Sequence, residues 1–438
     1  MNVEAPHGTA SRQAELLRRA RRVLAGGTLG LFALPPEVDL VVAYGRAGHV
    51  VDADGRDFVD YHLGSGPAFL GHGHPEIVAA VQRQVEKGST YYFLNEPAIE
   101  LAERVVDAVP CAEELAYAGS GSEATLMALR VARAATGRQK ILKFEGGWHG
   151  MNEYALWGMA PSRPSVFPVG QPDSAGVPPV IQDLVLLAPF NDAARAEQMI
   201  RENASDLAAV IVEPLQRVLV PVPGFLETLR RITQELGIVL IFDEVVTGFR
   251  IAWGGAQERY GVVPDLATYG KAMAGGFPMA AFAGRADVMR FLDSRRTEPG
   301  KRVWAGGTLN GNPIGAAAGV ASLNVLSRPG TYEHVHELGG RLRQGITSIG
   351  ARHGFTVQAL GEDAVFGVRF LDNPEPRNWA DLLASDKELG LRWSIELMER
   401  GILVNPNEKF YISVAHTSED IDRTLEAVEG AFAAIRAA

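Results

Sequence analysis

The amino-acid sequence predicts an α/β protein: a mostly parallel sheet in a large domain, followed by a smaller α+β C-terminal domain. Between residues 61 and 325, short apolar runs alternate with segments of helical period, which is typical of a parallel sheet with helices on both faces. After residue 325 the order changes to helix, neighbouring strands, a long helix, further strands and a closing helix. We therefore expect three parts: an N-terminal segment, 1–60, that packs with the small domain; the large domain, 61–325; and the small domain, 326–438.

The first expected element is a helix at residues 11–24, where apolar residues recur at helical spacing. Short strands are expected at 41–44 and 50–54, and the turn Asp52-Ala-Asp-Gly-Arg56 indicates a hairpin. In the large domain the apolar runs predict strands at 115–118, 140–144, 184–187, 208–212, 239–242 and 266–269. A helix after the first of these is expected to end at Gly137. The small domain has expected strands at 356–360, 365–370, 402–404 and 410–414, and an expected helix at 391–400.

Composition narrows the class of protein. The chain has 438 residues, 47% hydrophobic and 21% charged, as expected of a soluble globular protein of this layout. A net charge of −10 without an extended basic patch argues against nucleic acid as a partner. No apolar run approaches the ~20 residues of a membrane span, so no membrane association is expected. The single cysteine, Cys111, excludes an intrachain disulfide and suits the reducing cytoplasm, where we expect the protein to be located.

Lys271 and Asp243 are the central candidate residues. Asp243 ends the apolar run 237–242, which is typical of a buried parallel strand, and ligands bind at the carboxyl edge of such sheets. Lys271 follows the next expected strand and is preceded by Gly270. A buried carboxylate can hold a pyridinium nitrogen protonated, and a lysine can form a Schiff base with an aldehyde. This is the pair that pyridoxal phosphate requires.

Two Gly-containing turns are candidate phosphate sites. Ser120, Gly121 and Ser122 follow the strand at 115–118 and open a helix, whose N-terminal end suits a phosphate dianion. Ser120 and Glu123 also have the spacing of a capping box, so a well-capped helix without a ligand is the alternative. Thr308 offers a hydroxyl in the second turn, Gly306-Gly-Thr-Leu-Asn-Gly311.

Side chains after two other strands complete the candidate site. Trp148 is suited to lie flat on a pyridine ring, and His149 to orient that ring or to bond to backbone. Glu213 and Gln216 follow the strand at 208–212, where Gln216 can donate to a phenolate oxygen.

His72 and His74 have a metal-like spacing but no third ligand of matching context, so no metal site is expected. The Pro-rich segment 159–179 is predicted to be a lid, a binding loop or disordered.

The chain resembles a known family along nearly its whole length. The motifs that carry the resemblance are Ser-Gly-Ser-Glu-Ala (120–124), Lys-Phe-Glu-Gly-Gly-Trp-His-Gly (143–150), Phe-Asp-Glu-Val-Val-Thr-Gly-Phe-Arg-Ile-Ala (242–252), Asp-Leu-Ala-Thr-Tyr-Gly-Lys (265–271), Gly-Thr-Leu-Asn-Gly-Asn-Pro (307–313) and Ala-His-Thr-Ser-Glu-Asp-Ile-Asp (415–422). They are similar to those of the class III aminotransferases, a branch of the fold-type I pyridoxal-phosphate enzymes. Within that class the chain is most similar to the glutamate-1-semialdehyde 2,1-aminomutases.

This resemblance implies a cofactor, pyridoxal 5′-phosphate, and a role for each motif residue. Lys271 would form the Schiff base and Asp243 would contact the pyridinium nitrogen. Val245 would pack under the ring and Trp148 above it. Gly121 and Ser122 would bind the phosphate together with Thr308 of the other subunit, which implies a homodimer with active sites at its interface.

Three positions depart from the aminomutase pattern. Ala33 stands about where the aminomutases have an arginine for the substrate carboxylate, and a neutral residue cannot make that pair. Gln216 stands where many transaminases have Gln, and Arg217 replaces a usual Gly, which makes Arg217 a candidate for the carboxylate of a keto acid. Glu408, by contrast, matches the aminomutases and is the second candidate substrate contact.

The expected function is therefore that of an aminotransferase, which moves an amino group between an amine or amino acid and a keto acid. The alternatives on the same scaffold are an aminomutase, an amino-acid racemase or a decarboxylase. Five residues suggest a hydrophobic amine or a β-amino acid as substrate, although they are equally suited to the core: Leu29, Leu31, Phe32, Trp157 and Phe167.

Overall fold

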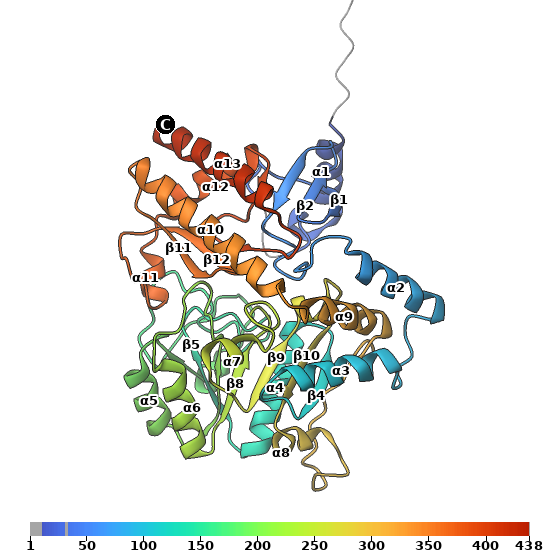
Figure 1. The fold of residues 1–438 in the computed structure, drawn as a ribbon. Coiled ribbons are helices and arrows are strands. Elements are labelled where there is room, and N and C mark those ends of the chain that lie inside the picture. The colour runs from blue at the N-terminus through green and yellow to red at the C-terminus, as the bar shows by residue number, and fades with distance from the viewer. Residues whose placement is uncertain (1–10, 31–33, 438) are drawn as a thin grey trace, which may run out of the picture.

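The computed structural model describes residues 11–30 and 34–437 and has a seven-stranded sheet at its centre (Figure 1). The strand order is β4-β10-β9-β8-β7-β5-β6, and β10 alone among these runs antiparallel to its neighbours. The strands are β4 (Glu114–Ala118), β5 (Lys140–Phe144), β6 (Val185–Ala188), β7 (Leu207–Val212), β8 (Val239–Asp243), β9 (Leu266–Tyr269) and β10 (Ala280–Gly284). The predicted, mostly parallel sheet is confirmed.

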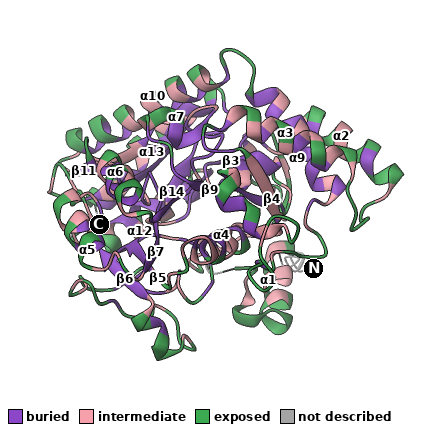
Figure 2. Cartoon of the chain, turned by 90° about the horizontal axis from the view of Figure 1, so that it is seen from below, coloured by how far each residue is buried: buried purple, intermediate pink, exposed green. Residues whose placement is uncertain are grey.

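Both faces of this sheet are buried, because successive side chains of a strand point to opposite sides. In β5, Leu142 and Phe144 belong to one apolar cluster and Ile141 to another. The helix α4 (Gly121–Thr136) packs into the second cluster, and α5 (Ala193–Glu202) and α6 (Phe225–Leu236) pack into the first. Figure 2 shows most strands of this sheet as buried, the edge strand β4 as mainly intermediate, and the outer faces of the surrounding helices as exposed.

Residues 61–325 contain further helices. They are α2 (Pro75–Lys87), α3 (Glu96–Ala108), α7 (Gly255–Tyr260), α8 (Ala286–Met289) and α9 (Pro313–Leu326), with 3-10 turns at Pro179–Asp183, Lys271–Ala274 and Arg290–Leu292. Of these helices, α2 packs on α9. The helix α4 ends at Gly137, whose left-handed backbone closes the helix as predicted.

Two smaller sheets are built from the ends of the chain. One has the order β1-β2-β3-β13 and the other β11-β12-β14. Their strands are β1 (Val42–Arg46), β2 (His49–Asp52), β3 (Asp57–Asp60), β11 (Val357–Glu362), β12 (Val365–Phe370), β13 (Ile402–Leu403) and β14 (Lys409–Tyr411). The antiparallel pair β2–β3 confirms the predicted hairpin, and β3 pairs in parallel with β13. The pairing of β3 with β13 supports the proposal that the N-terminal segment packs with the small domain.

Helices from both ends of the chain complete this part of the molecule, which lies above the large sheet in Figure 1. They are α1 (Arg12–Val23), α10 (Thr331–Arg352), α11 (Trp379–Leu383), α12 (Lys387–Glu399) and α13 (Ser418–Ala437), and a 3-10 turn, Ala25–Gly27, follows α1. Across the described ranges, no helix has both the length and the apolar character needed to cross a membrane.

Within the large sheet, β10 is the strand that the sequence pattern did not predict. Its residues, Ala280-Ala-Phe-Ala-Gly284, include few of the β-branched and aromatic types that mark strands. It forms because β4 and β9 lie on either side of it and pair with it along its length. Tertiary pairing therefore decides this strand, and local preference does not.

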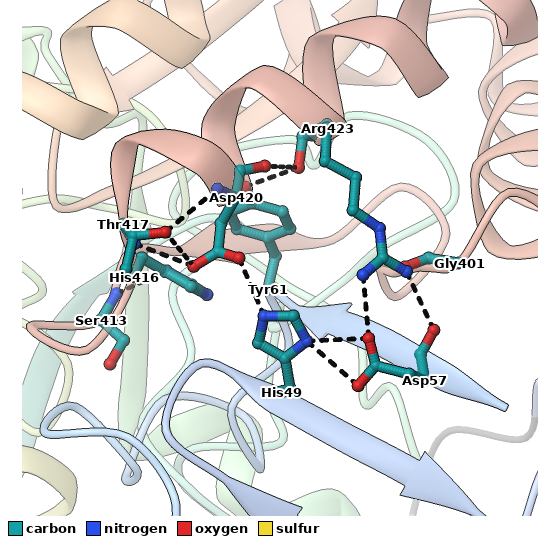
Figure 3. Close-up of polar contacts among 10 residues, drawn as sticks. His49, Asp57, Tyr61, Gly401, Ser413, His416, Thr417, Asp420 and Arg423 are labelled. Atoms are coloured by element: carbon teal, nitrogen blue, oxygen red, sulfur yellow. Dashed lines mark hydrogen bonds and ion pairs between the residues drawn. The ribbon is translucent and has the colours of Figure 1, made fainter. Parts of the chain in front are cut away.

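A histidine joins the N-terminal sheet to the last helix (Figure 3). His49 on β2 places Nε2 2.8 Å from Oδ1 of Asp420 on α13, and Nδ1 3.0 Å from Oδ2 of Asp57 on β3. Arg423 on α13 donates to the same Asp57 carboxylate at 2.8 Å. The hydrogen bond to Asp420 raises the pKa of His49 above its usual value against the effect of burial, and Asp57 adds to the rise.

We expect this contact to make stability depend on pH. Because the folded pKa of His49 is raised, its contribution is complete below the unfolded value of about 6.5 and is lost as pH rises through the folded pKa. In His49→Gln, the melting temperature should fall below that of the wild type at pH 6, and the two should converge at alkaline pH. Thermal melts of both proteins across this range measure the effect.

His74 offers a control of opposite sign. Burial lowers the pKa of His74, so its contribution grows as pH rises toward the unfolded value. The difference between wild type and His74→Gln should therefore widen as pH rises to about 6.5 and then stay constant, whereas that for His49→Gln narrows only above about 6.5. A His49→Gln difference that does not change with pH would contradict the assignment.

Candidate active site

A cavity of about 260 Å³ lies at the carboxyl edge of the large sheet. The strands β4, β5, β7, β8 and β9 all point in one direction, so the segments that follow them meet at this edge. Most of the predicted site residues line the cavity: Gly121, Ser122, Trp148, His149, Glu213, Arg217, Asp243, Val245, Lys271 and Glu408. The structure thus brings together side chains that are far apart in the sequence.

Lys271 lies in the cavity wall directly after β9 and Gly270. Its φ of 46° is in the left-handed region, which a side chain other than glycine enters at a cost on the order of 1 kcal/mol. Burial lowers the pKa of its ammonium group, and the positive charges of Lys409 and Arg250 act in the same direction. The amine therefore reaches its neutral, nucleophilic form at a lower pH than a solvated lysine.

Asp243 is the last residue of β8, and its carboxylate is held from several sides. Oδ1 accepts hydrogen bonds from Thr268 Oγ1 at 3.0 Å and from the Val245 backbone N–H at 3.2 Å. Oδ2 lies 2.8 Å from His149 Nδ1. Asp243 is only 6% exposed, so this network fixes a carboxylate at the cavity wall out of bulk water.

The N-terminal turn of α4 forms another wall. The Ser120 hydroxyl accepts from the Glu123 N–H at 3.3 Å, so Ser120 caps the helix, and Gly121 and Ser122 face the cavity. A Cβ added to Gly121 would lie 3.0 Å from Val245 Cγ1, so a larger residue would crowd this wall. Free backbone N–H groups at the start of a helix bind phosphate well.

The residues present fit pyridoxal phosphate. The amine of Lys271 can bond to the aldehyde of the cofactor, and the carboxylate of Asp243 can contact its ring nitrogen. The N-terminus of α4 can bind its phosphate. Among the residues that line the cavity, His149 has a buried ring nitrogen, Nε2, without a hydrogen-bond partner among the described residues. Because buried polar atoms are nearly always bonded, this nitrogen is suited to meet a polar group of a ligand or a water in the cavity.

Three of the predicted cofactor contacts do not line this cavity. Gln216 is fully buried, and its amide donates to the Glu145 carbonyl at 2.7 Å, so it lies behind the wall. Ser120 is exposed and acts as the helix cap. Thr308 is exposed on the surface of this chain, as a contact to a second subunit would require.

Trp148 and Arg217 form a stacked pair beside the cavity. The Arg217 guanidinium carbon lies 5.1 Å from the centre of a Trp148 ring and 5.7 Å from that of Trp379. Arg217 also donates to the carbonyl oxygens of Gly146 at 2.7 Å and Met159 at 3.0 Å. Glu213 accepts from the Trp148 backbone N–H at 2.7 Å, which fixes the start of this loop.

The Pro-rich segment 159–179 is held against this side of the site. Trp379 Nε1 donates to the Pro161 carbonyl at 2.9 Å, and the Ser165 N–H donates to Glu145 at 2.6 Å. These contacts link the segment to α11 of the small domain and to the loop that carries Trp148. This placement favours the interpretation of the segment as a binding loop over its interpretation as a lid or as disordered chain.

The structure adds residues that the sequence did not indicate. Ser65, Lys409 and Tyr411 line the cavity from segments far outside the strand ends. No sequence signal identifies them, because each is placed by packing between domains. Thr268 is different: it lies opposite Asp243 in the β8–β9 ladder, and strand register could have found it.

Two of the residues expected to form an apolar substrate surface lie in the core. Trp157 is 3% exposed and belongs to the core cluster of the α4 face, and Phe167 packs against the same cluster. Leu29 is 95% exposed. Leu31, Phe32 and also Ala33, at the position of the aminomutase arginine, lie outside the described residues.

Comparison with known proteins gives concordant results. Residues 35–430 match the family model of class-III aminotransferases. The chain is 40% identical to a glutamate-1-semialdehyde 2,1-aminomutase of Methanothermobacter thermautotrophicus, over 95% of this chain and 97% of that protein. An omega-transaminase from Sphaerobacter thermophilus has a similar structure, with a TM-score of 0.91, 34% identity and coverage of 97% and 98% of the two chains. A beta-phenylalanine aminotransferase from Variovorax paradoxus is also similar in structure, with a TM-score of 0.85 and 31% sequence identity. The match covers 95% of this chain and 92% of that chain.

The extent of these matches agrees with the cavity, which fits the cofactor of the family. The chain therefore belongs to the class-III aminotransferases, has the fold-type I pyridoxal-phosphate transferase fold, and uses pyridoxal 5′-phosphate as its cofactor.

Proposed function

We propose that the protein is an aminotransferase that moves an amino group between an amine or amino acid and a keto acid. The observation that carries this proposal is the meeting of Lys271, Asp243 and the N-terminal turn of α4 in one cavity. Bound there, pyridoxal phosphate withdraws electrons from the substrate carbon that bears the amino group. Lys271 would take a proton from that carbon and deliver it to the cofactor carbon that receives the nitrogen, while Asp243 would hold a proton at the ring nitrogen.

Arg217 supports transfer to a keto acid. Its guanidinium lies at the cavity wall, where aromatic rings and carbonyl oxygens fix it in place. A guanidinium held in this way pairs well with a carboxylate. With Ala33 at the position of the aminomutase arginine, Arg217 is our candidate for binding the carboxylate of the acceptor.

The second candidate function is that of a glutamate-1-semialdehyde 2,1-aminomutase. Two observations favour it: the 40% identity to a protein of that name and the position of Glu408 in the cavity wall. An aminomutase returns the amino group to the same carbon skeleton, so it needs no separate acceptor. Racemase and decarboxylase activities have no comparable support from the residues of the cavity.

One experiment separates these functions. The holoenzyme is supplied with a ¹⁵N-labelled amine, either a hydrophobic amine or a β-amino acid, with and without an added keto acid. We expect the label to appear in a new amino acid only when the keto acid is present. Rapid conversion of glutamate-1-semialdehyde to 5-aminolevulinate without any acceptor would instead identify an aminomutase.

We further propose a homodimer with active sites at its interface. Thr308 is exposed and does not line the cavity of its own chain. Leu309, the next residue in the chain, is 59% exposed, and Phe93 (80% exposed) and Leu94 (89% exposed) line one surface hollow with Asn310 and Gly311. A second copy of the chain would cover this apolar surface, and exposed patches of this kind are typical of interfaces.

A further inference from the structure

A second cavity, of about 200 Å³, adjoins the active-site cavity. The two share three wall residues, Arg217, Glu408 and Lys409. Apart from Val218, the remaining wall comes from the small domain, including Arg369 on β12, Trp379 on α11 and Lys387 at the start of α12. A substrate in the first cavity would therefore have this second space directly beside it.

The wall of the second cavity is strongly positive. Four cationic side chains line it, namely Arg217, Arg369, Lys387 and Lys409, against the single carboxylate of Glu408. Within the described parts of the chain, no salt bridge joins any of these four cations to a carboxylate. Positive charge that is partly buried without a partner is unfavourable, so an anion placed here would be bound favourably.

Hydrogen-bond donors are also free to meet an anion. Arg369 uses Nη1 to donate to the Val368 carbonyl at 2.9 Å, and no other bond from its guanidinium is formed within the described chain. The Ser385 hydroxyl is buried at the wall and has no partner there. Burial lowers the pKa of Arg369 to about 10, which still leaves the group charged at neutral pH.

We propose that the second cavity binds a carboxylate on the part of the substrate remote from the carbon that reacts. The acceptor would then be an oxo acid with two carboxylates, one near the reacting carbon and one paired with Arg369 and Lys387. This proposal rests on the proposed aminotransferase function. Trp379, Leu382 and Leu383 form apolar walls, which exclude water and so strengthen such a pair.

The test compares acceptors in wild type and Arg369→Gln. The holoenzyme is first loaded with an amino group from a donor, and the rate of its reaction with 2-oxoglutarate or with pyruvate is then measured. We expect the wild type to prefer 2-oxoglutarate, and Arg369→Gln to lose about tenfold or more of that preference through KM, with the rate for pyruvate unchanged. Arg392→Gln, an exposed arginine of α12 outside the cavity, is the matched control. If Arg369→Gln does not fold, the exposed Lys387→Gln replaces it.

A binding measurement separates this proposal from the proposed function. Calorimetry with the wild-type holoenzyme should show tighter binding of glutarate than of butyrate, and Arg369→Gln should remove the difference. Arg369-dependent binding of glutarate without reaction of any oxo acid would support the anion site and contradict the aminotransferase. Reaction with both oxo acids, with a preference that Arg369→Gln leaves unchanged, would overturn the anion site alone.

Discussion

Lys271→Ala should lose at least about 10³-fold in turnover, because this change removes both the group that bonds to the cofactor and the group that moves the substrate proton. Lys271 lies in the cavity wall, within reach of a bound cofactor and substrate. Burial lowers the pKa of its ammonium group, so the neutral amine forms more readily. The wild type should be yellow and should react with borohydride at Lys271. The variant should bind the cofactor without that covalent bond, which absorbance and mass spectrometry measure.

The surface lysine Lys140 provides the control for this change. Its Nζ lies 3.4 Å from an Asp206 oxygen, and exposed pairs of this kind contribute little to stability. Lys140→Ala should keep both colour and turnover. A colourless wild type that cannot be reconstituted with the cofactor, or a Lys271→Ala variant with normal turnover, would contradict the assignment of the lysine.

Asp243→Asn should slow turnover by about 10² to 10⁴-fold while the cofactor stays bound. The amide is close to the carboxylate in shape, so the contact from Thr268 and the wall around it should persist. The negative charge is lost, however, and with it the reason for the ring nitrogen to hold a proton. Single-turnover rates with a donor amine measure the loss, and the absorbance of the bound cofactor reports its retention.

Asp265 is a matched buried aspartate outside the cavity. It is 4% exposed and pairs with Arg230 at 3.0 Å and Arg285 at 2.8 Å. Asp265→Asn should lower the melting temperature and leave the turnover of the folded protein close to that of the wild type. Near-normal turnover in Asp243→Asn would show that another group contacts the ring nitrogen.

The sequence alone predicted six of the seven strands of the large sheet and the two residues proposed as the centre of the site. Apolar runs of strand length identified β5, β8 and β9, because a strand buried on both faces carries apolar side chains at most of its positions. Asp243 and Lys271 could be located for the same reason: each stands where such a run ends, and strand ends in a parallel sheet meet at one edge. The residue types and their order in the chain were therefore sufficient to locate these two side chains.

The tertiary structure decided the features that depend on contacts between segments far apart in the sequence. The Ala-rich β10 exists because of its neighbours, and Lys409 and Tyr411 reach the cavity because the small domain packs beside the strand ends. The sequence placed Gln216 at the cofactor, whereas the fold turns its amide toward the Glu145 carbonyl. The second cavity joins Arg217 to Arg369 across the two domains. Side-chain direction and packing between distant segments fix these features, and neither is encoded in a local pattern of residues.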